Sequence, residues 1–175
     1  MLRDGSLARF DVIHFATHAI KDDYPERSAL LLSPADTGPA AHSDSDIQAN
    51  EILRQWNLGA RIVTLSGCES ASWTGFGRGE FLGLVPALFG AGAQSVVGSQ
   101  WPVQDRATSL FMTRFYENLL GAHVDKRGGL PPHPCAADSA LREAKIWLRD
   151  YREPSGARPF EHPVYWSGYV LVGFP

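Results

Sequence analysis

The chain has 175 residues, of which 44% are hydrophobic and 20% are charged. These values are typical of a single globular domain spanning residues 1–175, large enough for one core, and they exclude an intrinsically disordered chain. The formal net charge of −3 and the absence of a lysine or arginine stripe disfavour direct binding to nucleic acid.

The cysteine content and the apolar segments indicate where the protein resides. Two cysteines at unlike positions do not form a disulfide framework, which favours a reducing compartment and a cytoplasmic location. The first residues contain no apolar stretch of signal-peptide length. Residues 81–104 lack formal charges, but Pro86, several glycines and polar residues favour a helix, a turn and a strand. No membrane partner is therefore expected.

The first half of the chain predicts two buried strands with a short strand and a helix between them. Residues 11–17 and 61–66 are apolar on both faces, as in strands covered by helices on both sides. Residues 29–33 predict a short strand. Asp46 is a candidate N-cap for a helix that would end at Gly59. The apolar positions of that helix have helical spacing: Ile47, Ile52, Leu53 and Trp56.

The second half predicts three helices and two strands. The helix over residues 106–120 is amphipathic, and the helix before it contains Pro86, which predicts a short or kinked element. Asp138 or Ser139 is the expected cap of the last helix. In chain order, the predicted elements are a helix over 80–90, a strand over 93–99, a helix over 106–120, a helix that includes 141–148, and a strand over 165–172. The alternation implies an α/β fold with a parallel-rich sheet flanked by helices.

Two of the predicted strands are followed by reactive side chains. His18 comes after the strand over 11–17, and Cys68 comes after the strand over 61–66. In open parallel sheets, chemistry gathers outside the carboxyl ends of the strands, and an imidazole beside a thiol makes a cysteine nucleophile. Their separation of 50 residues (68 − 18) matches the His-to-Cys spacing of about 50 residues that caspases show.

Other interpretations of these residues remain open. A cysteine is often only a small buried hydrophobe, and a buried structural histidine is the favoured interpretation of His14, which would share a strand face with His18. A zinc site of His14, His18 and Cys68 is disfavoured because no fourth ligand and no C-x-x-C motif occur, so no metal or other cofactor is expected. Cys135 lies in a predicted loop and is interpreted as incidental.

Four blocks of sequence, taken in order, resemble the CHAT domain. They lie between Val12 and Gly173 and read H-F-A-T-H-A, V-T-L-S-G-C-E-S, F-G-A-G-A-Q-S-V-V-G-S-Q-W-P-V-Q-D and P-V-Y-W-S-G-Y-V-L-V-G. CHAT domains are caspase-like cysteine peptidases that are related to separase and are often joined to TPR repeats. The resemblance implies a caspase-hemoglobinase fold, a three-layer sandwich with a mostly parallel central sheet.

The resemblance also implies roles for individual residues. His18 and Cys68 would be the catalytic dyad, and the backbone N–H groups of Ala19 and Cys68 would hold the oxyanion. Ala19 stands where caspase-like enzymes usually have glycine, but it keeps the N–H group. Gly67 would let the backbone come close to the substrate.

The segment W-P-V-Q-D suggests a substrate pocket. Separase-like relatives use an acidic residue of a W-x-V-x-D segment to hold a basic P1 side chain. Here that residue is Asp105, and Trp101 would form a wall of the pocket. The alternative is that Asp105 only caps the helix that begins near Arg106.

The expected partners are a protein or peptide substrate and a TPR-containing or other regulatory partner. Related domains usually carry a strand and a helix before the His strand, whereas about ten residues precede it here. The chain is therefore expected to be a fragment, a short variant, or a form whose sheet edge another part covers, and to be poorly active alone. The alternatives to an endopeptidase are an inactive CHAT-like interaction module and a small-molecule thiol hydrolase.

Overall fold

A computed structural model describes residues 5–20, 22, 24–32, 46–66, 83–122 and 134–174. The chain divides into two compact units. The first contains Met1–Trp101 and Val172–Phe174, and the second contains Pro102–Leu171 and Pro175. Strands dominate the first unit, whereas a pair of long helices dominates the second.

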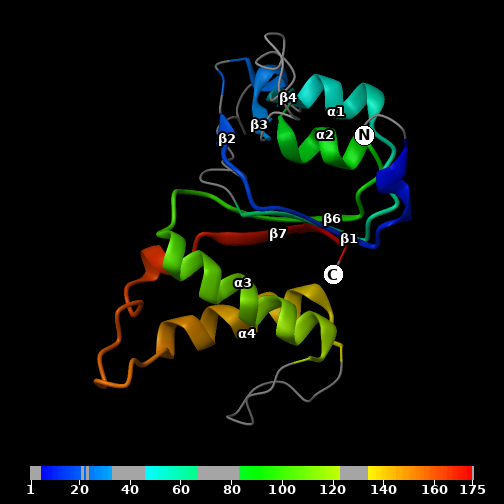
Figure 1. Cartoon of the computed structure of the whole chain (residues 1–175). Coiled ribbons are helices and arrows are strands. Elements are labelled where there is room, and N and C mark those ends of the chain that lie inside the picture. Colours follow the sequence, from blue (N-terminus) through cyan, green and yellow to red (C-terminus); the bar gives the residue numbers. More distant parts are fainter. Residues whose placement is uncertain are drawn as a thin grey trace, which may run out of the picture. The chain divides into compact units, whose positions relative to one another are not determined.

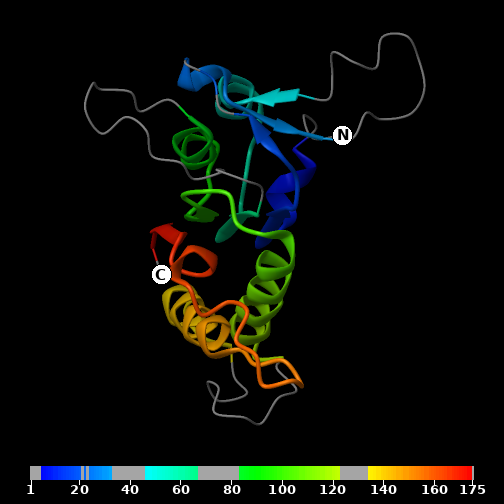
Figure 2. The same ribbon diagram turned by 90° about the vertical axis from the view of Figure 1, so that its left-hand side faces the viewer.

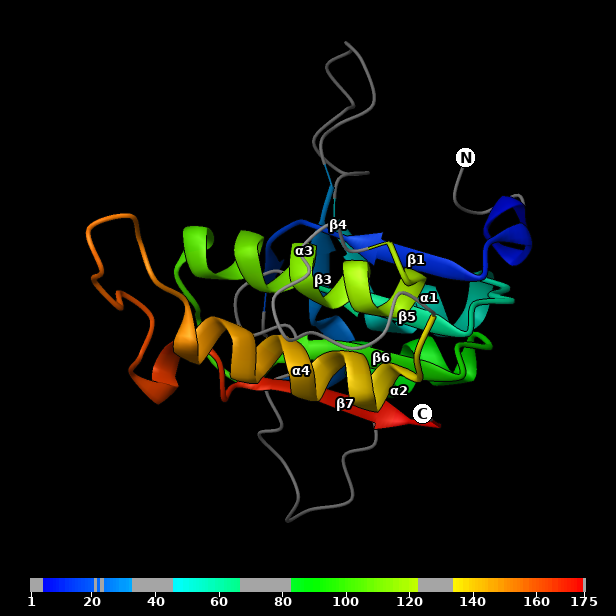
Figure 3. The ribbon, with the colours of Figure 1, turned by 90° about the horizontal axis from the view of Figure 1, so that it is seen from below.

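Within the described residues, the larger sheet has four strands in the order β1-β5-β6-β7 (Figure 3). β1 pairs with β5, and β5 with β6, in parallel register. The end of β7 lies beside the beginning of β6, because the Phe174 N–H donates to the Gln94 carbonyl at 3.3 Å. The sheet is thus mixed and mostly parallel, which confirms the predicted α/β class. The strands are β1 (Val12–Phe15), β5 (Ile62–Leu65), β6 (Ser95–Ser99) and β7 (Tyr169–Gly173).

The two central strands carry the apolar core of this sheet. Every residue of β5 and of β6 is buried, as the continuous apolar runs predict for strands covered on both faces. β1 differs from the prediction. In the part of the chain that the structure describes, it is an edge strand whose burial alternates, with Ile13 and Phe15 buried and His14 exposed. It ends at Phe15, two residues before the predicted boundary.

Two short helices, α1 (Ala49–Gln55) and α2 (Leu84–Gly90), lie side by side on one face of the sheet (Figure 1). Pro86 stands in the first turn of α2, where its missing N–H is not needed for the helix. Gly90 lies where α2 contacts α1, because a Cβ there would meet a methyl group of Leu53, a flexible side chain that would have to turn aside.

The prediction that Asp46 caps a helix is wrong. Asp46–Gln48 form strand β4, and α1 begins at Ala49 and ends at Gln55, before the expected stop at Gly59. Asp46 and the next two residues pair with strand β3 in an antiparallel ladder. This pairing satisfies backbone groups that a helix would otherwise have used.

A second, smaller sheet has the order β2-β3-β4 and is antiparallel (Figure 2). Its strands are β2 (Ala19–Ile20), β3 (Ala29–Leu31) and β4 (Asp46–Gln48). β1 ends at Phe15, and β2 begins four residues later, at Ala19. The segment that carries His18 therefore connects the two sheets.

The second unit is built on α3 (Asp105–Leu120) and α4 (Ala137–Asp150), which run side by side in opposite directions (Figure 3). α3 confirms the predicted amphipathic helix and ends at Gly121, whose φ of 66° suits a left-handed cap. α4 begins earlier than predicted: Ala136 is its N-cap, so Asp138 and Ser139 lie inside its first turn. Buried side chains line the pair: Ala107, Phe111, Phe115, Leu119, Ala140, Ala144 and Leu148.

A buried ion pair links the two helices. Arg114 of α3 has 2% of its side chain exposed, and it donates from Nε and Nη2 to both carboxylate oxygens of Glu143 on α4, at 2.6 to 3.2 Å. Asn118 donates to the same carboxylate. Such a bidentate pair holds two planar groups in one geometry, which sets how α3 and α4 align.

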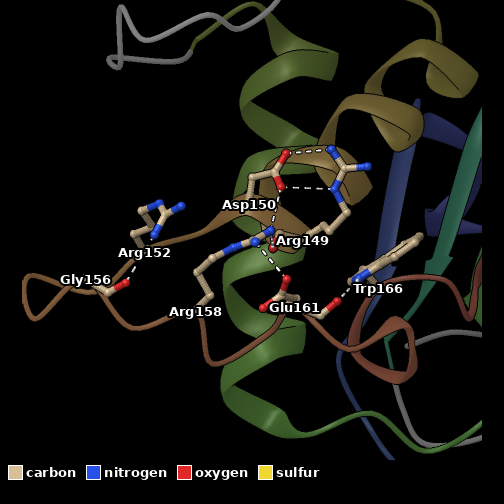
Figure 4. Close-up of polar contacts among 7 residues, drawn as sticks. All are labelled: Arg149, Asp150, Arg152, Gly156, Arg158, Glu161 and Trp166. Atoms are coloured by element: carbon tan, nitrogen blue, oxygen red, sulfur yellow. Dashed lines mark hydrogen bonds and ion pairs between the residues drawn. The ribbon is translucent and has the colours of Figure 1, made fainter.

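Arginines also fix the connection between α4 and β7 (Figure 4). Arg158 donates to Glu161 at 2.8 Å and to Asp150 at 2.9 Å, and Asp150 also pairs with Arg149. A 3-10 turn over Pro163–Tyr165 follows. This turn delays the closing strand, so β7 begins at Tyr169 rather than near residue 165.

Candidate functional site

The ends of β1 and β5 lie side by side. Phe15 pairs with Leu65, so the register offset between the two strands is 50 residues (65 − 15). The Ser66 N–H donates to the Phe15 carbonyl at 3.1 Å, which extends the pairing one residue further. His18 and Cys68 have the same offset of 50 (68 − 18) in the sequence. Gly67 and Cys68 lie outside the described residues, so their placement stays a prediction.

The end of β6 lies beside the end of β5. Leu65 pairs with Gly98, an offset of 33 residues (98 − 65), and Trp101 follows Cys68 by the same 33 positions (101 − 68). The Ser99 hydroxyl donates to the Trp101 carbonyl at 2.9 Å, which fixes the turn after β6. Trp101 is half-buried, so part of this residue is accessible at the strand end.

His18 is exposed and lies between β1 and β2. The sequence predicts that His18 shares a strand face with His14. This prediction is wrong, because β1 ends at Phe15, before His18. Hydrogen bonds on either side tie it to Leu31 of β3: the Thr17 hydroxyl donates to the Leu31 carbonyl, and the Leu31 N–H donates to the His18 carbonyl at 2.9 Å. The backbone that presents the imidazole is therefore held by the smaller sheet.

Ala19 directs its N–H away from β3. The bond from Leu31 to the His18 carbonyl makes His18 and Leu31 a hydrogen-bonded pair, so the next pair, Ala19 and Leu30, is of the non-hydrogen-bonded type. In such a pair, N–H and C=O groups point outward. Since β2 is an edge of its sheet within the described ranges, the Ala19 N–H is directed where a ligand can accept from it.

His14 departs from its sequence interpretation in one respect. It is hydrogen-bonded, with Nε2 2.8 Å from the Ser66 hydroxyl, but its side chain is exposed rather than buried in the core. Partial desolvation of the ring lowers the pKa of His14 below its ordinary value of 6.5. The imidazole is consequently neutral at neutral pH.

Asp105 is the first residue of α3, is exposed and belongs to the second unit. The helix N-cap is Gln104, so Asp105 does not occupy the capping position that the sequence suggests as an alternative. A carboxylate in the first turn still favours the helix dipole. Its role in binding a P1 side chain stays a prediction.

Cys135 shows the properties of a structural thiol. It is half-buried, its Sγ donates to the Asn118 carbonyl at 3.2 Å, and burial raises the pKa of the thiol. A raised pKa reduces the thiolate fraction and hence reactivity. Among the described residues, no group of three or more His, Cys, Asp or Glu side chains is arranged to hold a metal ion.

Sequence reasoning missed Thr17 and Ser66. Each is a hydroxyl residue close to a predicted catalytic residue, which is the only local signal for either. Their partners, Leu31 and His14, lie 14 and 52 residues away in the sequence, so only the folded structure identifies the contacts.

The profile of the CHAT domain family matches residues 2–174. The chain belongs to the CHAT domain family. This family is related to caspase-like peptidases, so the comparison agrees with the mostly parallel sheet and with the resemblance that the sequence blocks indicate. Within the described part of this CHAT domain, no helix is long and apolar enough to cross a bilayer.

Two curated relatives are similar over nearly the whole CHAT domain. Tetratricopeptide repeat protein 28 from Mus musculus is 27% identical over 97% of this chain, and the Homo sapiens protein of the same name is 26% identical over 97%. The chain spans only 7% of the length of either relative. Both relatives are named for tetratricopeptide (TPR) repeats. This agrees with the association between CHAT domains and TPR repeats that the sequence resemblance implies.

Proposed function

We propose that this CHAT domain is a cysteine endopeptidase with His18 and Cys68 as its dyad. The pairing of residues at the ends of β1 and β5 carries the proposal. Phe15 pairs with Leu65, and each is followed three positions later in the sequence by one member of the dyad (18 − 15 and 68 − 65). Parallel strands that end together bring the segments that follow them to one edge of the sheet.

The reaction uses only groups that the chain supplies. His18 accepts the proton of the Cys68 thiol, and the thiolate attacks the scissile carbonyl carbon. His18 then gives the proton to the leaving amine as the carbon–nitrogen bond breaks, which leaves a thioester on Cys68. A water molecule, deprotonated by His18, attacks the thioester. The carbon–sulfur bond then breaks, His18 returns the proton to the sulfur, and the carboxylic acid product leaves the regenerated Cys68 thiol.

The oxyanion of each tetrahedral intermediate needs donors beside the attacked carbonyl. The Ala19 N–H supports this role, because the pairing of Ala19 with Leu30 directs it outward from β2 and because it follows His18 directly. The Cys68 N–H is the proposed second donor. Donors fixed in position before the reaction stabilise developing charge without reorganisation.

We also propose that the enzyme favours a basic P1 side chain, with Asp105 as its partner, Trp101 as a pocket wall and Gly67 as a point of close backbone approach. The exposed Asp105 carboxylate is able to pair with an arginine or lysine. Asp105→Asn would then reduce cleavage after basic residues by about 1.5–3 kcal/mol of transition-state stabilisation, the value of a charged hydrogen bond, and spare cleavage after neutral residues. A P1 library profile that the substitution leaves unchanged would contradict this assignment.

The names of the relatives support a form of regulation. Both are tetratricopeptide repeat proteins, and we propose that a TPR-containing partner or an attached repeat region controls this domain. Cleavage assays with and without such a partner test this point. Equal kcat/KM in the two conditions would exclude that control.

The deciding experiment is covalent labelling with a peptide chloromethyl ketone. Mass spectrometry should locate the label on Cys68 in the wild type and in Cys135→Ser. His18→Ala should be labelled slowly. Cys68→Ala should not be labelled at position 68 and should not cleave a peptide library. His18→Ala and Cys68→Ala should both retain the wild-type melting temperature. Equal labelling of Cys68 and Cys135 with no cleavage would instead favour an inactive interaction module.

A further inference from the structure

A side-chain hydrogen bond joins the first two strands of the larger sheet at their carboxyl ends. His14 Nε2 lies 2.8 Å from the Ser66 hydroxyl. The Ser66 N–H meanwhile donates to the carbonyl of Phe15, the residue after His14, at 3.1 Å. Ser66 is therefore held through both its backbone and its side chain. Two anchors on one residue restrict its rotation far more than the backbone bond alone.

The location of this bond links it to the proposed dyad. Ser66 precedes Cys68 by two residues, and His14 precedes His18 by four. Thr64, two residues before Ser66, is fully buried in β5 and pairs with His14 in register. In the sequence, Ser66 thus lies between the buried end of β5 and the proposed nucleophile Cys68.

We propose that His14 is a positioning residue that, through Ser66, holds the segment leading to Cys68 in register with the segment that bears His18. The inference rests on the proposed function. The hydrogen bond between His14 and Ser66 acts through geometry alone, since a small displacement of the reacting groups is enough to lower the rate severely.

The protonation state of His14 agrees with a positioning role. Partial desolvation of the imidazole lowers the pKa of His14, so at neutral pH the ring forms a neutral hydrogen bond with the Ser66 hydroxyl. A neutral ring beside the strand ends leaves the acid–base role of the proposed dyad to His18. His14 and His18 consequently have distinct roles, one structural and local, the other chemical.

The test measures the reactivity of Cys68 rather than turnover. Iodoacetamide alkylation of the full chain is followed by mass spectrometry from pH 5 to 9, and the thiol of Cys135 serves as an internal reference. Ser66→Ala and His14→Phe remove the hydrogen bond, whereas Ser66→Thr keeps the hydroxyl. His18→Ala reports what loss of the dyad does to the same profile.

The proposal expects the Cys68 rate at pH 7 to fall about three- to tenfold in Ser66→Ala and in His14→Phe, the loss of one hydrogen bond, and to stay near wild type in Ser66→Thr. The double variant should be no slower than either single variant. A global loss of folding would raise the alkylation rate of Cys135, which distinguishes it from loss of the hydrogen bond alone.

Two results would overturn the proposal, and they differ from failure of the proposed function. Wild-type rates in Ser66→Ala, or equal losses in Ser66→Ala and Ser66→Thr, would show that the hydrogen bond does not position the thiol while the dyad stands. If His18→Ala leaves the Cys68 profile unchanged, the dyad itself is wrong, and the positioning role fails with it.

Discussion

Phe15 and Leu65 pair at the ends of two parallel strands, and both are buried. Their pairing sets an offset of 50 residues that His18 and Cys68 share in the sequence. A one-residue slip between β1 and β5 would move the buried side chains of β1 to the opposite face. The same hydrophobic pattern that holds the sheet together therefore sets the register on which the proposed dyad depends.

Thr17 is expected to matter for catalysis through its hydroxyl. Thr17→Val removes the donor to the Leu31 carbonyl but keeps the shape of the side chain. We expect kcat for peptide cleavage to fall about three- to tenfold, as for one lost hydrogen bond, because the backbone of His18 is less well held. Thr17→Ser should retain wild-type kcat. Equal kcat values for the valine and serine variants would contradict a role for the hydroxyl.

The direction of the Ala19 N–H predicts a contrast between two proline variants. Ala19→Pro removes an outward N–H, which an edge strand tolerates, so the fold should survive while kcat falls about 10²- to 10³-fold, as for a lost oxyanion donor. Ile20→Pro removes an N–H that faces β3 and should lower the melting temperature. Ala19→Gly, which keeps the N–H, is the matched control. Full activity in a folded Ala19→Pro would exclude the role.

Removing one partner of the Arg114–Glu143 ion pair should cost far more stability than removing one partner of a surface pair. Glu143→Ala leaves the charge of Arg114, 2% exposed, without its main partner, and should lower the free energy of unfolding by about 3–5 kcal/mol. Asp11→Ala breaks the pair with Arg61, in which both side chains are at least half exposed, and should cost less than about 1 kcal/mol. Urea titrations compare the two. Similar midpoints would refute the difference.

His14 should make stability depend on pH in the acidic range. Its pKa is lowered in the folded chain, so the unfolded chain takes up the proton at a higher pH than the folded chain does. Stability is then fully present above pH 6.5, the ordinary value, and falls as the pH drops toward the folded pKa. The melting temperature should decrease less between pH 7 and pH 5 in His14→Gln and in His14→Phe than in the wild type. Parallel curves would contradict this assignment.

Local sequence determined those elements whose pattern is long or uniformly apolar. The runs that became β5 and β6 have no polar side to expose, and the helix over residues 105–120 repeats its apolar positions with helical spacing. These features depend on neighbours within one turn or one strand. The α/β class follows from them. The CHAT resemblance rests instead on four ordered sequence blocks, and the candidate dyad of His18 and Cys68 rests on the residues that follow two strands and on their spacing.

The tertiary structure decided what depends on distant partners. Asp46 entered a strand because it pairs with Leu31, and β1 stopped at Phe15, leaving His18 beside the smaller sheet. A two-residue strand such as β2 has no periodicity to detect. The contacts of Thr17 with Leu31 and of His14 with Ser66 span 14 and 52 residues, and such pairings exist only once long-range burial has brought the strands together.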